Sequence, residues 1–338
     1  MSESSGKGFD VINAEKAPRD LFTPGSGARP NRFRILVGID GSDESYRGLR
    51  YAAKLGGGVD ADIVLCYVRP IDQGLRSGGL QVRVARENML EWGLELPGIK
   101  YLRQGLKLLQ ELGVMDDSWQ EESFHQGVEG DPLGDNKTVY SSPTGKQVTL
   151  KLKVAPDIAT GILEQWEIGE YDLIIIGASE RWRKRRVKSF WDPALAEKIA
   201  VHAPCSVLVA RELEVGHGHL ICTDGSDKAE DAVRIDAELA SRCNCPVTLL
   251  SVAHDDDGEP DAVAAVARAS TMVESQGIEV HETLVRIGEP VKEICETGVD
   301  YSLIVLSDTA RTGLKRFFMG SVAFKVLEEA RNSVMIVR

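Results

Sequence analysis

The chain has few cysteines, no long apolar run and no excess of positive charge. Its six cysteines are scattered through 338 residues without a Cys-x-x-Cys pair, which argues against a disulfide scaffold and against a zinc or redox motif. The longest wholly apolar stretches, such as Ala262–Ala267, are far shorter than the roughly 20 residues that span a bilayer, and the first residues lack an export signal. We therefore expect a cytoplasmic protein without a membrane span.

Acidic residues outnumber basic ones by 52 to 40, which gives a net charge of −12. This balance works against attraction of the whole surface to nucleic acid or anionic lipid, so a polyanionic partner would have to bind at a locally basic patch. With 43% apolar and 27% charged residues the composition is that of a globular protein, and the length indicates about two domains.

One strand–turn–helix pattern occurs twice. An apolar run leads into Asp40-Gly41-Ser42, and a second apolar run leads into Asp224-Gly225-Ser226, 184 residues later. Later apolar runs also match in pairs, at offsets of 130 and 127: residues 171–176 with 301–306, and 206–211 with 333–338. The pattern predicts an internal repeat, with 54 extra residues between the second and fourth strands of the first copy.

Each copy is predicted to alternate five strands with four helices. The Val-, Ile- and Leu-rich runs lack alternation, which is typical of a parallel sheet with helices on both faces. We expect an α/β fold of two tandem, doubly wound domains. The predicted boundaries are a flexible tail over residues 1–31, a first domain over 32–212 with an insertion at about 80–154, and a second domain over 218–338.

Asp40 and Asp224 each end the first strand of a copy, at the edge where open parallel sheets bind ligands. A carboxylate there can accept hydrogen bonds from a ribose hydroxyl or an amine, and Ser42 or Ser226 can cap the next helix. In the alternative interpretation, Asp-Gly-Ser serves only the turn and the helix cap.

Gly320-Ser321 precedes a helix predicted at 322–330. The unpaired N–H groups and positive partial charge of a helix N-terminus attract phosphate, Gly320 permits close approach, and Ser321 adds a hydroxyl donor. The basic residues before them, Arg311 among them, are either phosphate partners or a solvated loop.

Both copies resemble universal stress protein domains, most closely in Arg311-Thr312-Gly313-Leu314-Lys315-Arg316 and the following Gly320-Ser321-Val322-Ala323. The resemblance implies a Rossmann-like sheet of five strands in the order 3-2-1-4-5. It also implies pairing of the two domains within the chain through their last strands. In the nucleotide-binding branch of the family it implies ATP, with Mg²⁺, held by a G-x2-G-x9-G-[S/T] loop.

Carried onto this chain, the resemblance implies nucleotide-binding residues mainly in the second copy. Ser307 and Ala310 replace the first two glycines of the motif, and a Cβ at either position hinders close approach to phosphate. The first copy has Pro193 and Ala194 in place of Gly320 and Ser321, which leaves at most an adenosine pocket without a phosphate cradle. The residues implied are Asp224, Val252, Ser307, Ala310, Arg311, Gly320 and Ser321 in the second copy, and Asp40, Val68 and Gly177 in the first.

Two further segments carry candidate chemistry. A basic loop in the first copy is expected either to bind an anionic or protein partner or to stay solvated; its basic residues are Arg181, Arg183, Lys184, Arg185, Arg186 and Lys188. His217 and His219 flank Gly218 and are interpreted as the start of a linker, because no Cys or carboxylate cluster has metal-ligand spacing around them.

The expected function is an adenine-nucleotide-binding regulatory module of the stress response, not a metabolic enzyme. The sequence has no G-x4-G-K-[ST] loop, G-x-S-x-G elbow or HExxH helix, and no nucleophile with a visible base. Two alternatives stay open: a scaffold that binds no nucleotide and acts through its surfaces, and a slow ATPase. Association into a homo-oligomer, through the insertion or the basic loop, stays open for each of these functions.

Overall fold

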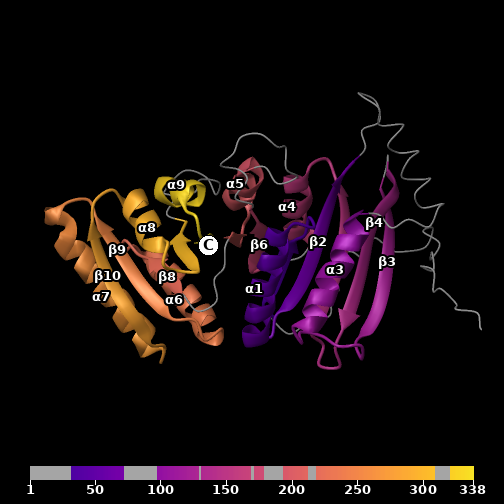
Figure 1. Ribbon diagram of the computed structural model, residues 1–338, viewed down its shortest axis with the longest axis horizontal. Helices are drawn as coiled ribbons and strands as arrows, with labels where there is room; N and C mark the ends of the chain where they lie inside the picture. Colours follow the sequence, from indigo (N-terminus) through magenta and orange to yellow (C-terminus); the bar gives the residue numbers. More distant parts are fainter. Residues whose placement is uncertain are drawn as a thin grey trace, which may run out of the picture.

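The computed structural model describes residues 32–71, 97–128, 131–168, 171–178, 193–211, 218–308 and 320–338. Residues 32–211 are called the first half below, and residues 218–338 the second half. The predicted tail at 1–31, the basic loop at 181–188, and Ala310 and Arg311 lie outside the described residues. The fold is α/β with a mostly parallel sheet (Figure 1).

All twelve strands of the described residues join one sheet, in the order β10-β9-β8-β11-β12-β7-β6-β1-β2-β5-β4-β3. The first half contributes β1 (Arg34–Gly38), α1 (Asp43–Val59), β2 (Asp62–Pro70), α3 (Pro97–Glu111), β3 (Gln120–Val128), β4 (Asp131–Ser141), β5 (Gln147–Ala155), α4 (Ile158–Ile168), β6 (Leu173–Gly177), α5 (Pro193–His202) and β7 (Ser206–Ala210).

The second half contributes β8 (His219–Cys222), α6 (Asp227–Arg242), β9 (Val247–Ala253), the 3-10 turn η4 (Asp256–Gly258), α7 (Glu259–Ser275), β10 (Val280–Ile287), α8 (Pro290–Gly298), β11 (Leu303–Ser307), α9 (Ser321–Glu329) and β12 (Ser333–Val337). Its five strands pair in parallel throughout.

The position of β5 corrects the expected extent of the insertion. β5 was placed within the insertion at 80–154, but it pairs in parallel with β2, as β10 pairs with β9 in the second half. Only β3 and β4 are added to the edge of the sheet, as an antiparallel hairpin on β5. The reason is burial: β5 is almost wholly buried, whereas β3 is largely exposed.

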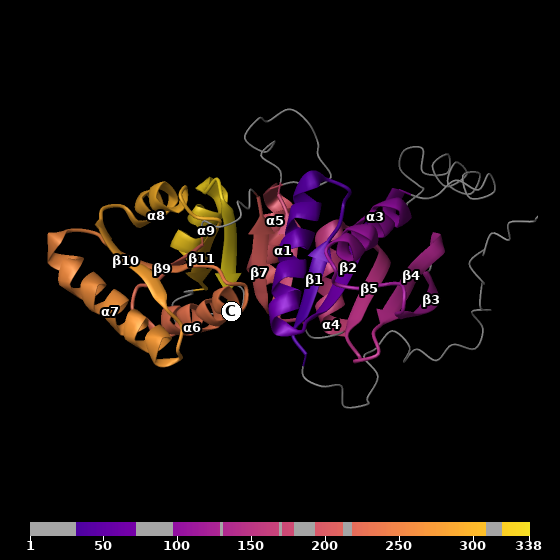
Figure 2. The ribbon, with the colours of Figure 1, turned by 60° about the horizontal axis from the view of Figure 1, so that its bottom comes forward.

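Helices cover both faces of the sheet, so successive strand residues enter two different cores. Ile35 and Val37 of β1 belong to a core that also contains residues of α1, α3, α6 and α7, while Leu36 belongs to a second core with residues of α4, α5, α8 and α9. Each core contains residues of both halves, and Figure 2 shows the two sets of helices on either side of the strands. Two buried faces explain why the strands carry unbroken apolar runs.

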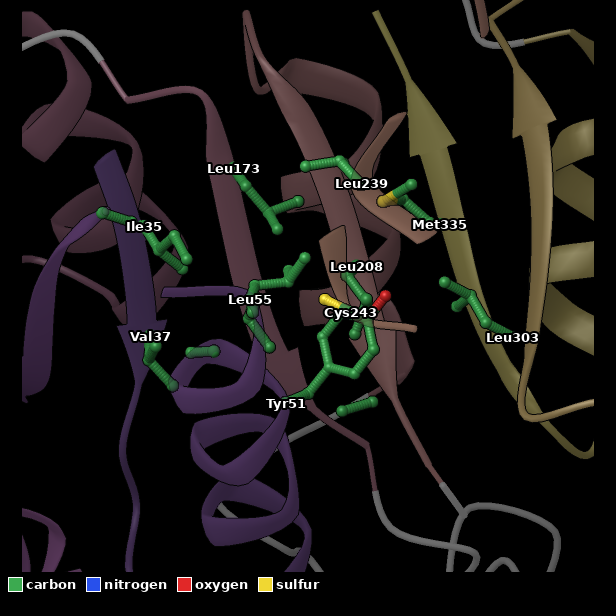
Figure 3. Close-up of a cluster of buried hydrophobic side chains, with 14 of the residues drawn as sticks. Ile35, Val37, Tyr51, Leu55, Leu173, Leu208, Leu239, Cys243, Leu303 and Met335 are labelled. Carbon is green, nitrogen blue, oxygen red and sulfur yellow. The ribbon is translucent and has the colours of Figure 1, made fainter. Parts of the chain in front are cut away.

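The two halves meet where β7 and β12, the last strand of each half, pair antiparallel. Leu208 of β7 lies opposite Met335 of β12, and Figure 3 shows both side chains in one apolar cluster with residues of either half. We call this junction the seam. Across it α1 contacts α6 on one face of the sheet, and α5 contacts α9 on the other. Pairing in this way removes two open sheet edges, which would otherwise invite association with other chains.

Two equivalent arginines reinforce the seam reciprocally. Arg211 follows β7 and donates to the carbonyl oxygens of Leu327, Ala330 and Asn332 at the end of α9. Arg338 follows β12 and donates to the carbonyl oxygens of Ala200, Val201 and Ala203 at the end of α5. Each guanidinium therefore satisfies carbonyl groups that the last turn of a helix in the other half leaves unpaired.

The hairpin is attached through buried charge. Arg69 of β2 donates both Nη atoms to the Asp131 carboxylate of β4, at 2.5 and 2.6 Å. Lys153 of β5 lies 3.0 Å from Asp135, which also accepts the Val154 N–H at 2.6 Å. The Arg69 and Asp131 side chains are 8% and 2% exposed, so removing either one would take away an opposite charge at hydrogen-bond distance from a buried side chain.

Candidate functional site

The carboxyl edge of the second half brings together residues from three strands and one helix. Because β9, β8 and β11 are parallel neighbours, their ends lie side by side: Val252 near the end of β9, Asp224 after β8, and Ser307 at the end of β11. Gly320 and Ser321 begin α9, which follows β11 in the chain. Asp224 and Ser321 are exposed, Val252 and Gly320 partly exposed, and Ser307 buried.

The Asp-Gly-Ser turns perform the turn and capping roles in both halves. Ser226 donates from N and Oγ to Asp224 Oδ1 at 3.0 and 2.6 Å, and its Oγ accepts the Ala229 N–H at the start of α6. Gly225 has φ +75°, a conformation that favours glycine. These bonds use a single carboxylate oxygen of Asp224. Oδ2 of this exposed side chain is left for a hydroxyl or amine of a ligand.

The N-terminus of α9 differs from those of α1 and α6. Ser42 and Ser226 cap the latter two helices with side-chain hydrogen bonds, whereas Gly320 caps α9 without any side chain. An N-terminus without a side-chain cap presents amide N–H groups and positive partial charge to an anion. The end of α9 that follows β11 therefore has the chemistry of a phosphate site.

Basic side chains surround the turn of the second half. Lys228 Nζ donates to the Asp308 carbonyl oxygen at 3.0 Å, and Arg268 Nη2 donates to the Gly225 carbonyl oxygen at 3.1 Å. Lys228 occupies the position that Glu44 holds in the first half, by the offset of the repeat. The lysine ammonium favours an anionic ligand near the second turn, and the glutamate carboxylate disfavours one near the first.

The first half has a shallow depression at the equivalent edge. It is lined by the two residues that follow β1 and by residues of β2 and α4, namely Ile39, Asp40, Cys66, Tyr67, Val68, Ile158 and Ile162. Two of the predicted residues, Asp40 and Val68, thus lie together. Asp40 Oδ1 accepts from Ser42 N and Oγ at 2.9 and 2.5 Å, as in the second half.

Gly177, the third predicted residue of the first half, has a packing role. A Cβ at this position would lie 2.5 Å from the Ser45 backbone nitrogen, so β6 and α1 approach closely only because Gly177 has no side chain. The helix that follows, α5, begins at Pro193, which has no backbone N–H to offer a phosphate. The start of α5 therefore offers one amide donor fewer than the start of α9.

His219 corrects a second expectation. It was interpreted as the start of a linker, but it is the first residue of β8 and only 1% exposed. Its Nδ1 lies 2.8 Å from Asp236 Oδ2 of α6, and its Nε2 lies 3.3 Å from the Tyr51 hydroxyl of α1. Burial alone would lower the pKa of His219, but the Asp236 carboxylate outweighs it and raises the pKa to about 9.

Two structural features outside the predicted site were not recognised in the sequence. One is the His219 cluster, whose members are far apart in the chain and carry no motif. The other is the pair Arg211 and Arg338, for which a signal was present: both end the matched segments 206–211 and 333–338, and both strands begin with serine. Ser333 and Ser206 each accept the backbone N–H of the opposite arginine, at 2.9 and 3.3 Å.

The described part of the chain contains no group of three or more His, Cys, Asp or Glu side chains arranged to hold a metal ion. No helix of that part combines the length and apolar character needed to cross a membrane.

Comparisons with known proteins agree with this architecture. The profile of the Universal stress protein family matches residues 31–96 and 219–338. Universal stress protein MJ0531 of Methanocaldococcus jannaschii is 27% identical over 137 residues, which cover 35% of this chain and 80% of the relative.

The structure of a universal stress protein from Archaeoglobus fulgidus DSM 4304 aligns with a TM-score of 0.58 and 14% identity, over 90% of this chain and 98% of that one. A functionally unknown protein from Pseudomonas aeruginosa PAO1 aligns with a TM-score of 0.52 and 15% identity, over 91% and 92% of the two chains. With matched segments that cover more than half of its length, the chain belongs to the universal stress protein family.

Proposed function

We propose that the chain is a cytoplasmic tandem universal stress protein that acts as a regulatory module. It binds an adenine nucleotide, which we propose to be ATP, in its second half. The two halves are then two domains of strand order 3-2-1-4-5, joined as an intrachain pseudo-dimer at the seam. Two other universal stress proteins have been solved in complex with cAMP and with dAMP, the latter from Archaeoglobus fulgidus. For this chain the proposal rests on its own residues.

The observation that carries the proposal is the N-terminus of α9, which has no side-chain cap and follows the strand beside β8 and Asp224. In this arrangement Asp224 Oδ2 accepts from the ribose, the backbone near Val252 contacts the base, and the first amides of α9 and Ser321 hold phosphate. Lys228 adds positive charge at the same edge. Mg²⁺ would enter with the phosphates, since the described residues offer no cluster of three protein ligands.

The test is calorimetric titration of the whole chain with ATP and Mg²⁺, together with mass analysis of any nucleotide released on denaturation. Asp224→Asn keeps an oxygen for the Ser226 donors but removes the charge, and Gly320→Val blocks close approach to the helix start. Each substitution removes about one charge-assisted hydrogen bond between the protein and the nucleotide, so we expect the affinity for ATP to fall roughly 10- to 100-fold. Asp40→Asn is the matched control in the first half and should leave the affinity unchanged.

The outcomes separate the candidate functions. If wild-type protein neither binds ATP nor releases nucleotide, the proposal is wrong and the chain is a scaffold that acts through its surfaces. Steady phosphate release that disappears in Gly320→Val would instead make it a slow ATPase. A second candidate is a nucleoside site without phosphate contacts in the first half, favoured by the position of Asp40 beside Val68. Loss of adenosine binding in Asp40→Asn alone would identify that site.

A further inference from the structure

A cluster of titratable side chains lies at the seam, away from the proposed nucleotide site. It joins Tyr51 and Lys54 of α1 to His219 of β8, Asp236 of α6 and Cys245 of the loop between α6 and β9. We call these five residues the seam cluster. Figure 3 shows Tyr51 in the apolar cluster at the same junction, with Cys243, the residue that ends α6.

The seam cluster orients a thiol between two cations. Lys54 Nζ donates to Cys245 Sγ at 3.1 Å, and the charge of His219 also stabilises the thiolate form of Cys245. His219 is held by Asp236, which lies 2.8 Å from its Nδ1. A carboxylate thus orients an imidazole near a sulfur that a lysine contacts, and neighbouring cations of this kind activate cysteine nucleophiles.

Charge balance favours the thiolate. Asp236 is fully buried and its Oδ1 has no hydrogen-bond partner, so its negative charge requires the protonated form of His219. His219 and Lys54 then place two positive charges against Cys245, opposed by the Cys243 carbonyl oxygen at 3.8 Å. Burial would raise the pKa of Cys245, but hydrogen bonds and charge from His219 and Lys54 outweigh it and lower the pKa. The other titratable groups facing the cluster are Tyr51, whose burial keeps its pKa raised, and the Cys243 thiol, whose pKa burial raises to about 11.

Packing alone does not require these polar residues. At the offset of the repeat, His219, Asp236 and Cys245 correspond to Ile35, Ala52 and Ala61 of the first half. All three of those residues are apolar and fully buried. Equivalent positions therefore carry apolar side chains in the first half and a charged cluster in the second half. Because buried ion pairs are seldom better for stability than apolar residues of similar size, stability gives no reason for the cluster.

We propose that Cys245 is a reactive thiolate held between Lys54 and His219, and that hydrogen peroxide oxidises the protein at this site to a sulfenic acid. The sulfur lone pair attacks one peroxide oxygen and the O–O bond breaks. The sulfur is oxidised, the peroxide is reduced, and the leaving hydroxide takes a proton from the His219 imidazolium to form water. Cys245 is partly exposed, so a small oxidant can reach it. Oxidation replaces a thiolate by a larger neutral group at the contact between the halves.

The chain contains its own control for this proposal. Cys295 is also partly exposed, but burial and Glu329 raise its pKa to about 11. The pKa of Cys245 is instead lowered by His219 and Lys54, so the thiolate fraction at pH 7 is larger at Cys245 than at Cys295. The lower nucleophilicity of a less basic thiolate cancels only part of this difference in rate. We therefore expect iodoacetamide to alkylate Cys245 at least about tenfold faster than Cys295 at pH 7, as read by peptide mass analysis.

Variants at Lys54 separate activation from packing, because this side chain is exposed and can be replaced without disturbing the core. Lys54→Met should slow alkylation of Cys245 at pH 7 by about threefold and move its pH profile upward, and Lys54→Arg should restore the rate. Lys107→Met, at an exposed lysine of α3, is the matched control and should have no effect. With hydrogen peroxide and dimedone, the sulfenic acid adduct should form on Cys245 before any other cysteine. Equal rates for Cys245 and Cys295, or a Cys245 pH profile that is the same in Lys54→Met as in wild type, would overturn the proposal.

Discussion

Replacing the buried pair His219 and Asp236 by Ile and Ala, the residues at the equivalent positions 35 and 52, should remove a pH dependence of stability. In the folded protein Asp236 raises the pKa of His219 from its ordinary value of 6.5 to about 9. A tenfold change in a protonation equilibrium is about 1.4 kcal/mol, so the protonated pair contributes on the order of 3 kcal/mol.

The direction follows from linkage. Because the pKa is higher in the folded than in the unfolded chain, the folded protein binds the proton more tightly. The contribution is therefore complete below pH 6.5 and is lost as the pH rises through about 9. The free energy of unfolding should fall by about 3 kcal/mol over this range in the parent protein. It should change by less than about 1 kcal/mol from this source in the double variant, which has no group at these positions to titrate.

Urea unfolding at constant ionic strength, at several pH values from 6 to 9.5, measures this difference. Both proteins should carry Cys245→Ser, so that this thiol does not titrate in the same range, and the other buried thiols then contribute equally to both. The fall in the parent should be somewhat smaller than about 3 kcal/mol in this background, because Cys245 contributes to the raised pKa of His219. Asp236→Ala alone should be destabilised by about 3–5 kcal/mol at pH 6.5, because it leaves His219 without its partner, and adding His219→Ile should recover most of the loss. The same slope of stability against pH in parent and double variant would contradict this prediction, since it would mean that His219 is not charged in the fold.

Two further predictions concern buried arginines. Arg338→Met should lower the free energy of unfolding by about 3 kcal/mol, because three carbonyl groups at the end of α5 lose a charged donor. Urea titrations measure this change, with Arg234→Met at an exposed arginine as the control. A decrease no larger than that of the control would contradict the prediction. Arg69→Met should cost about 3–5 kcal/mol by removing the guanidinium that offsets the buried Asp131 carboxylate, and Arg69→Met with Asp131→Leu should regain most of it in thermal unfolding; an equally unstable double variant would show that the charge pair is not the cause.

Much of the architecture could be predicted from the sequence because it depends on local patterns. The unbroken apolar runs predicted strands buried on both faces, and a mostly parallel α/β fold is confirmed. The recurrence of Asp-Gly-Ser predicted two equivalent turns, in which Gly41 and Gly225 both have positive φ and the serines cap α1 and α6. The candidate nucleotide residues stay a prediction. Of these, Asp224, Val252, Ser307, Gly320 and Ser321 lie on elements at one edge of the second half, and Gly177 has a packing role.

The local elements follow from the sequence itself, because hydrophobic period, turn chemistry and helix capping act over a few neighbouring residues. Long-range packing selects which elements complete the sheet and which side chains meet at the seam. β5 belongs to the parallel core because burial, not its place within a long insertion, selects its partner strand. The seam cluster forms because antiparallel pairing of β7 and β12 brings α1 against α6, so that Tyr51 and His219, 168 positions apart, share a buried site. No local pattern encodes such a contact, since its stability depends on the exclusion of water from both sides at once.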